Sequence, residues 1–294
     1  MPAGSDPVVG DTLGPGQLVA SSELIRAYVN STGDEGFARH AAAIRLATGK
    51  SIAPPTIFDR DLGTRLYRSK YTSVYSLHAR QRFEFRRPIE EGLTYTISGQ
   101  LASIFTRNGI DYAVLDAVCV APDGEEILFS TYTRAFRFPE NRYRHEGPGR
   151  VRPTVASFLA QHQARPTTRF PEPGSVVEGA SRQVTQSSMN LYSGPGSNIH
   201  TDRWVARRRG HPDTIVQGLM STALECELYR ELFGVRWYTS GHISMKYIAN
   251  IMTGACLTAL GVVVANGDGR LELQTAVSNE QQEILTVGTV SVQM

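Results

Sequence analysis

The chain has 294 residues, 41% of them apolar, and its 30 basic residues are nearly balanced by 28 acidic ones. This composition is typical of a globular protein with one large domain or two of standard size. The net charge of +2 provides no electrostatic footprint for nucleic acid or for a membrane surface. No stretch approaches the roughly 18 uninterrupted apolar residues of a membrane-spanning helix, and the N-terminus resembles no signal peptide. We therefore expect a cytoplasmic protein that binds neither nucleic acid nor membrane.

The residues that usually hold metals and nucleotides are scattered. Cys119, Cys226 and Cys256 lie far apart without CxxC spacing or clustered histidines, which favours buried thiols over a disulfide or zinc site. A glycine-rich phosphate loop of the GxGxxG or GxxxxGKS type is missing from the sequence. The sequence therefore predicts no metal and no cofactor.

In the first half of the chain, helical patterns precede strand patterns. A helix is expected in SSELIRAYVNSTGD, where Ser21 or Ser22 can cap it, and a second over residues 56–66. Alternating β-branched and aromatic residues between Gly- and Asp-containing turns then predict an antiparallel sheet. Its strands are expected within residues 75–89, 93–109, 110–121 and 125–138.

The second half repeats this order. A short helix with Tyr192 is followed by the strongest helical segment, residues 213–234, which Gly234 ends. That helix carries an apolar stripe of Ile215, Leu219, Leu224, Leu228 and Leu232. Strands are expected within residues 241–251, 256–266, 269–278 and 283–294.

Nearly constant offsets relate the two halves. Tyr28 precedes Tyr192 by 164 residues, and an offset of 162 residues relates Phe85, Gly92 and Gly99 to Tyr247, Gly254 and Gly261. We therefore predict an α+β fold, a tandem (double) hotdog in which each half is a long helix wrapped by an antiparallel sheet. Residues 1–138 and 175–294 would be the two hotdog domains, and the Pro-, Arg- and Gly-rich residues 139–174 the linker. Joining two half-sheets edge to edge would also cover edge strands that invite aggregation.

The segment that enters the long helix of the second half carries a family resemblance. Tyr192-Ser193-Gly194 … Asn198-Ile199-His200-Thr201-Asp202, followed by Gln217-Gly218-Leu219-Met220, resembles the MaoC-like (R)-specific enoyl-CoA hydratases and β-hydroxyacyl dehydratases. The first-half sequence LHARQRFEFRRPIEEG resembles the N-terminal hotdog of their double-domain members. The resemblance covers most of the chain apart from the linker.

This resemblance implies a site for acyl thioesters. In the family, an aspartate and a histidine hold the water that adds to or leaves the β-carbon, and a glycine amide binds the thioester carbonyl. The histidine corresponds to His200, as base and acid, and the glycine to Gly218, where the helix dipole favours enolate charge. The family's aspartate would lie five residues before the histidine, and that position is Pro195.

Several residues could compensate for the missing carboxylate. Asn198 is the predicted water-orienting group, and Ser197 is an alternative. Asp202 is expected to cap the following turn. Asp34 ends a first-half segment, Tyr28 to Asp34, that resembles the Tyr…Ser/Thr-Gly-Asp pattern, and Tyr192 is a further candidate.

Further side chains are expected to bind the substrate. Arg207 and Arg208, within a run of three arginines, would attract the phosphates of coenzyme A or an acidic carrier protein, and Gln217 lies beside the carbonyl-binding glycine. His78 and His242 begin comparable strands and are expected to be structural or interfacial.

Together these patterns predict a hydratase or dehydratase, a lyase acting on a β-hydroxyacyl or trans-2-enoyl thioester of coenzyme A or acyl carrier protein. The alternatives are a hotdog pocket reused for cyclisation or isomerisation of a biosynthetic intermediate, and a non-catalytic subunit that binds acyl thioesters. A homodimer is compatible with each of these functions, although a double hotdog is already dimer-like within one chain.

Overall fold

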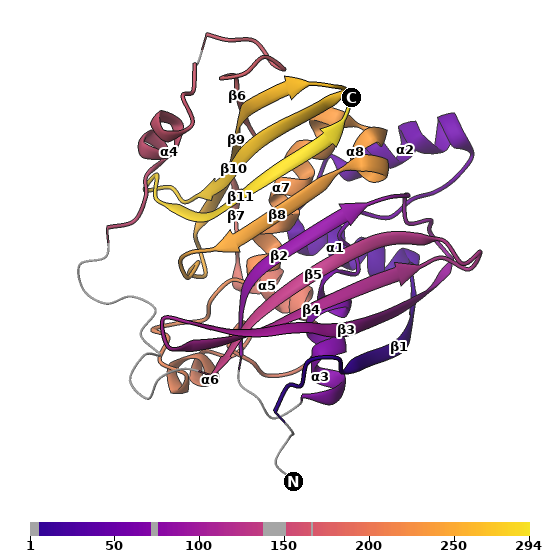
Figure 1. Cartoon of the computed structure of the whole chain (residues 1–294), viewed down its shortest axis with the longest axis vertical. Helices are drawn as coiled ribbons and strands as arrows, with labels where there is room; N and C mark the ends of the chain where they lie inside the picture. The colour runs from indigo at the N-terminus through magenta and orange to yellow at the C-terminus, as the bar shows by residue number, and fades with distance from the viewer. Residues whose placement is uncertain (1–5, 72–75, 138–150, 166) are drawn as a thin grey trace.

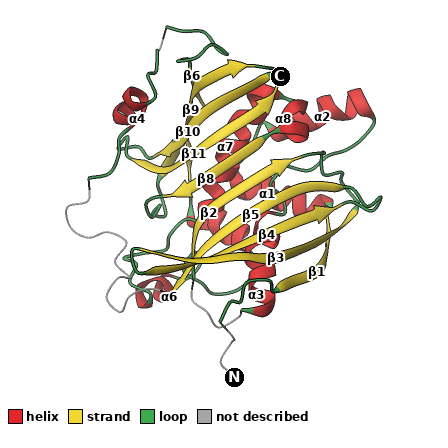
Figure 2. Cartoon of the chain, viewed as in Figure 1, coloured by secondary structure: helices red, strands yellow, loops and turns green. Residues whose placement is uncertain are grey.

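The computed structural model describes residues 6–71, 76–137, 151–165 and 167–294, and most of its helices lie behind a broad twisted sheet in the view of Figures 1 and 2, with α4 set apart from them. The first-half strands are β1 (Thr12–Val19), β2 (Leu77–Phe85), β3 (Thr94–Arg107), β4 (Ile110–Val120) and β5 (Glu126–Arg137). The second-half strands are β6 (Val176–Glu178), β7 (Arg182–Gln183), β8 (His242–Tyr247), β9 (Cys256–Gly267), β10 (Arg270–Ser278) and β11 (Ile284–Gln293). None of the described helices is long and apolar enough to cross a membrane.

One sheet runs through both halves in the order β1-β3-β4-β5-β2-β8-β11-β10-β9-β6, with the short β7 paired to β9. The halves meet where β2 pairs antiparallel with β8, and at this seam Phe83 lies opposite Ile243. Both side chains are almost completely buried, so the seam belongs to the core rather than to a surface contact. Each half therefore protects the sheet edge of the other.

The strand pairing confirms the internal duplication that the sequence offsets predict. In the first half Leu13 of β1 pairs with Gly99 of β3, and in the second half Val177 of β6 pairs with Gly261 of β9. The helices α1 (Ser22–Thr32) and α5 (Gln186–Ser193) follow these edge strands, and each begins at a side-chain cap. Their equivalent tyrosines, Tyr28 and Tyr192, contact each other with ring centroids 5.9 Å apart.

The two long-helix predictions had different outcomes. Helix α7 (Gly218–Phe233) is the buried helix expected in the second half, and α8 (Val235–Ser240) follows it. In the first half, residues 55–58 form a turn, and the predicted helix follows it over residues 59–70, where it contains a π-helical turn, η1 (Asp61–Arg65), and α3 (Leu66–Lys70). Gly63 packs so closely on Tyr132 that a Cβ would lie 2.6 Å from the ring, which explains how this short element approaches the sheet.

The remaining helices are α2 (Phe37–Thr48), α4 (Val155–Gln161) and α6 (Arg203–Arg208). Helix α4 belongs to the predicted linker, and its Phe158 packs against a cluster that includes Val262 of β9 and Ile284 of β11. Residues 138–150 and 166 of that linker lie outside the described residues, and the domain boundaries stay a prediction. Cys119 and Cys226 are buried, Cys256 is partly buried, and all three are free thiols.

Candidate functional site

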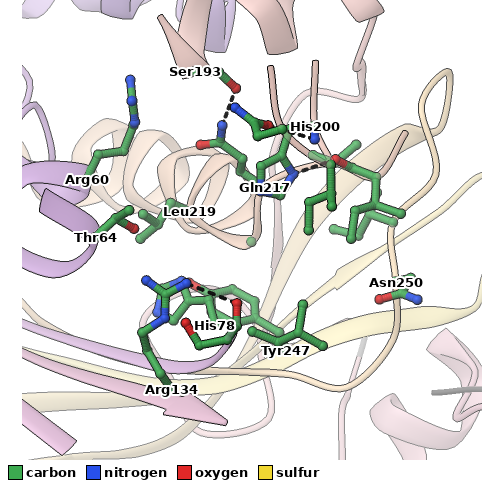
Figure 3. Close-up of a pocket in the computed structure, with 18 of the residues that line it drawn as sticks. Arg60, Thr64, His78, Arg134, Ser193, His200, Gln217, Leu219, Tyr247 and Asn250 are labelled. Carbon is green, nitrogen blue, oxygen red and sulfur yellow. Dashed lines mark hydrogen bonds between the residues drawn. The ribbon is translucent and has the colours of Figure 1, made fainter. Parts of the chain in front are cut away.

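A cavity of about 410 Å³ lies where the two halves meet, beside the N-terminus of α7. The second half contributes the loop that contains His200, residues 215–219 and residues 247–251. The first half contributes parts of η1, α3, β2 and β5. Figure 3 shows side chains from both halves pointing into the space between them. The site is therefore composite, and neither half would form it alone.

His200 lines the cavity, and its ring orientation is fixed. Its Nδ1 lies 2.7 Å from the main-chain carbonyl oxygen of Ile215. A carbonyl can only accept, so Nδ1 carries the hydrogen and Nε2 is left as an acceptor. Burial lowers the pKa of His200 to about 4, and the nearby positive charges of Arg68 and Arg134 lower it further, against the hydrogen bond to Ile215. His200 is therefore a neutral base near pH 7.

Asn198 also lines the cavity, and its side chain supports the histidine loop. The Asn198 Oδ1 accepts a hydrogen bond from the main-chain N–H of His200 at 2.8 Å. Because that oxygen is engaged, the amide nitrogen is the part of Asn198 with donors left for a ligand or a water molecule. Asn198 thus both positions His200 and offers a polar group to the cavity.

Gly218 is the first residue of α7, and it lines the same cavity as His200. Gln217 precedes it without providing a side-chain cap, and the first N–H groups of a helix have no partner within the helix. A Cβ at Gly218 would lie 2.8 Å from the ring of Tyr247, so glycine is required for this close packing. The helix end therefore presents donors and a positive dipole to the cavity.

Pro195, at the position of the family's aspartate, is exposed and does not line the cavity. It lies between Gly194 and Gly196, which both have positive φ. Among the described residues that line the cavity there is no aspartate or glutamate. The described lining of the cavity therefore provides no carboxylate in place of the one expected at Pro195.

Asp202 is the helix cap that the sequence predicts. Its Oδ1 accepts hydrogen bonds from the main-chain N–H groups of Trp204 (2.8 Å) and Val205 (3.2 Å), at the start of α6. Its Oδ2 accepts a 2.6 Å hydrogen bond from the Ser197 hydroxyl. Ser197 lines the cavity, but its hydroxyl hydrogen is directed to this cap.

Tyr192 lies behind the cavity rather than in its lining. Its hydroxyl donates to Asp59 at 2.5 Å, and both side chains are buried. Burial raises the pKa of Asp59 to about 7, against the lowering effect of the Tyr192 hydrogen bond. The main-chain carbonyl of Tyr192 accepts from Arg60, which does line the cavity. No sequence pattern singles out Asp59, since it occurs in a segment predicted only as a helix.

Asp34, a further candidate from the sequence, does not line the cavity. It is buried between α1 and α2 and forms a bidentate ion pair with Arg230 of α7. The Nη2–Oδ1 distance of this pair is 2.7 Å. Its carboxylate therefore links the helices of the two halves, because both of its oxygens are engaged by the guanidinium.

The structure places the predicted arginines outside the cavity lining. Arg207 bonds to the Pro212 carbonyl and Arg208 lies over the Trp204 ring, and neither lines the cavity. Their neighbour Arg209 lines it instead, because α6 ends at Arg208 and the chain turns there. Gln217 lines the cavity and donates a hydrogen bond to Ser193.

The first half supplies a wall that the sequence did not reveal. His78, expected to be structural or interfacial, lines the cavity between the halves and packs against Tyr132 and Tyr247, with ring centroids 4.1 and 4.7 Å away. Arg134 of β5 lies beside them, and burial together with its charge lowers the pKa of His78. His242 lies at the start of β8, away from this cavity. Within the described ranges, no group of three or more His, Cys, Asp or Glu residues could hold a metal ion.

Solved structures share this architecture at low sequence identity. No protein-family model and no curated protein sequence matches the chain. A MaoC-like dehydratase has a TM-score of 0.75 at 18% identity, covering 97% of this chain and 98% of its own. A putative MaoC domain protein dehydratase from Chloroflexus aurantiacus has 0.71 at 12% identity, covering 98% and 96%. A conserved hypothetical protein of Mycobacterium tuberculosis with a double hotdog fold has 0.65 at 14% identity, again covering 98% and 96%. The chain therefore has a double-hotdog fold of the kind found in MaoC-like dehydratases.

Proposed function

We propose that the protein is a hydratase or dehydratase of a β-hydroxyacyl or trans-2-enoyl thioester, carried by coenzyme A or an acyl carrier protein. The observation that carries this proposal is the orientation of His200. Its Nδ1 is bound to the Ile215 carbonyl, so that an unprotonated Nε2 is available in a cavity that also contains the N-terminus of α7. A neutral base beside the N–H groups that begin a helix suits chemistry that passes through an enolate.

In the dehydration direction, His200 Nε2 removes the α-proton, and the electron pair moves onto the thioester oxygen. The Gly218 N–H and the α7 dipole stabilise that oxyanion. The electron pair then returns to form the α,β double bond while the imidazolium protonates the departing β-hydroxyl, which leaves as water. Asn198 orients that water through its amide nitrogen. Hydration is the reverse of these steps. In both directions His200 alone performs the proton transfers that MaoC-like enzymes divide between a histidine and an aspartate.

The test is the loss of ultraviolet absorbance when the protein meets short and medium-length trans-2-enoyl-CoA. We expect turnover by the wild-type protein and a loss of at least about 10²-fold in His200→Ala, because a general base contributes about 10²–10⁴-fold. His162→Ala is the matched control, because His162 is partly buried and lies outside the cavity. Activity retained in a folded His200→Ala protein would remove the histidine from the mechanism.

One observation favours a second candidate function. The described cavity lining has no carboxylate, and Pro195 stands where the family's aspartate is expected. A pocket reused for cyclisation or isomerisation of a biosynthetic intermediate needs shape and one polar group more than a catalytic pair. Wild-type protein that binds enoyl thioesters without hydrating them would favour this candidate or a non-catalytic binding subunit. Pro195→Asp tests for a diverted hydratase, since a large gain in hydration would indicate that only the carboxylate is missing.

A further inference from the structure

A buried arginine with unused donors lies in the cavity wall. Arg134 on β5 is 5% exposed and lines the cavity. Its Nη2 donates to the Ser76 carbonyl oxygen at 3.1 Å, while Nε and Nη1 are buried and have no hydrogen-bond partner in the described part of the chain. Nε has one N–H and Nη1 has two. Three donors of a permanent cation therefore have no partner among the described residues.

Aromatic rings hold this cation without neutralising it. The Arg134 guanidinium lies 5.2 Å from the ring centroid of Tyr67 and 5.3 Å from that of Tyr132. Such contacts recover only part of the cost of burying a charge, and a buried charge is normally paired with an opposite one. No described acidic residue lines the cavity to provide that pairing. Within the described lining of the cavity, Arg134 is thus a buried cation without a carboxylate partner.

The arginines that line the cavity differ in their exposure to solvent. Arg68 and Arg209 are exposed residues of its lining, whereas Arg134 is buried. Figure 3 shows Arg134 beside His78, on the wall opposite Gln217 and His200. The exposed arginines are accessible to the phosphates of a thioester's carrier, which remains at the solvent end of a bound substrate. Arg134 can meet only a group that enters the cavity.

We propose that the acyl group of the substrate carries a carboxylate, and that Arg134 binds this carboxylate within the cavity. A carboxylate is an acceptor-only anion whose two oxygens match the N–H groups of a guanidinium. The inference rests on the proposed function, which places the thioester carbonyl at Gly218 and leaves the far end of the acyl group to the opposite wall. It names a substrate class, thioesters of dicarboxylic acids.

The turnover test compares two five-carbon substrates that differ at the acyl terminus, trans-glutaconyl-CoA with a carboxylate and trans-2-pentenoyl-CoA with a methyl group. We expect kcat/KM to favour the carboxylate by about 10²-fold or more, the scale of a buried charge-assisted contact. Arg134→Met should reduce this preference to within about threefold, chiefly by slowing the carboxylate substrate, and Arg134→Lys should restore part of it.

A binding test separates this inference from the proposed function. Calorimetry with the saturated thioesters glutaryl-CoA and pentanoyl-CoA reports recognition without turnover. If neither enoyl thioester is hydrated but glutaryl-CoA still binds more tightly, and Arg134→Met abolishes the difference, the inference holds and the hydratase proposal fails. If both are hydrated and Arg134→Met leaves their ratio unchanged, the inference fails and the hydratase proposal stands.

Two control measurements separate recognition of the acyl group from effects on the carrier or on the fold. Arg68→Met removes an exposed arginine of the same cavity and should weaken both CoA thioesters alike. An equal loss for both thioesters in Arg134→Met would assign Arg134 to the carrier and overturn the inference. Thermal melting of Arg134→Met checks the fold, and we expect an unchanged or higher Tm because an unpaired buried charge is replaced by an apolar side chain of similar length.

Discussion

At the scale of single residues, the surroundings of His200 determine its pKa and its tautomer. Histidines in folded proteins usually titrate near 6.5, but burial brings the pKa of this one to about 4. The hydrogen bond from Nδ1 to Ile215 then decides which nitrogen is available to a substrate. A residue of the same type at an exposed position would have neither the fixed tautomer nor the low pKa.

This pKa predicts the acid side of the activity profile. His200 is the neutral base above about pH 4, so at pH 5.5 we expect kcat/KM to remain above about nine-tenths of its plateau, whereas a pKa of 6.5 would leave about one-tenth. Enoyl-CoA hydration assayed from pH 4.5 to 8 checks this, and a half-maximal point near 6.5 would contradict it.

A stability control must accompany those assays. The unfolded chain binds a proton at His200 near pH 6.5 and the folded chain only near 4, so the stability that the neutral histidine contributes is lost as the pH falls between these values. Thermal melts at each pH separate loss of catalysis from loss of the fold.

At the scale of secondary-structure elements, the buried ion pair between Asp34 and Arg230 joins α7 to the first half. Arg230 is almost completely buried, with 1% of its side chain exposed, and both of its terminal nitrogens contact the Asp34 carboxylate. Removing one partner would leave an uncompensated charge in the core. We therefore expect replacement of both Asp34 and Arg230 to destabilise the protein less than replacement of one of them.

We expect Arg230→Met to lower the free energy of unfolding by about 3–5 kcal/mol, and Asp34→Leu with Arg230→Met to recover most of that loss. Urea denaturation measures both. Arg39→Met is the matched control, because Arg39 forms an exposed ion pair with Glu231 and should cost less than about 1 kcal/mol. Equal costs for Arg39→Met and Arg230→Met would show that the buried pair does not join the helices as described.

Elements with a strong periodic pattern could be predicted from the sequence. The alternating strands and the apolar stripe of α7 are local signals, and so is the motif that brings His200 and Gly218 to one cavity. Helix α2 was not predicted, although Phe37, Ala41 and Ile44 stand at helical spacing; only Phe37 and Ile44 of its twelve residues are buried, so this signal is short. Arg134 and His78 could not be assigned to the site, because they reach it through the pairing of β2 with β5 and β8.

At the scale of the whole molecule, one sheet runs through both halves, and the seam between β2 and β8 lies in its middle. Separating the halves would expose two strands whose side chains at the seam, such as Phe83 and Ile243, are buried in the whole chain. Unpaired strands with apolar side chains are templates for aggregation. The duplicated units are therefore predicted to depend on each other for stability.

We expect residues 1–137 and 151–294, produced separately, to aggregate or self-associate, since each would present an uncovered β2 or β8 edge. Size-exclusion chromatography and circular dichroism measure this outcome. Mixing the two fragments during refolding is the companion experiment, and recovery of a one-to-one complex would show that the seam suffices for assembly. A stable, folded monomer of either fragment would contradict the dependence.

Duplication within one chain also frees each copy to change alone. Strand β5 starts at Glu126 and the equivalent strand β11 starts 158 residues later, at Ile284. By the same offset, Val292 is the second-half equivalent of Arg134. Both positions are buried, but one bears a cation and the other an apolar side chain. In a symmetric pair of identical subunits, a change to arginine would enter both copies, with the cost of a buried charge each time. The fused chain can confine that charge to one copy, so an ancestral pair of equal sites could give way to a single specialised one.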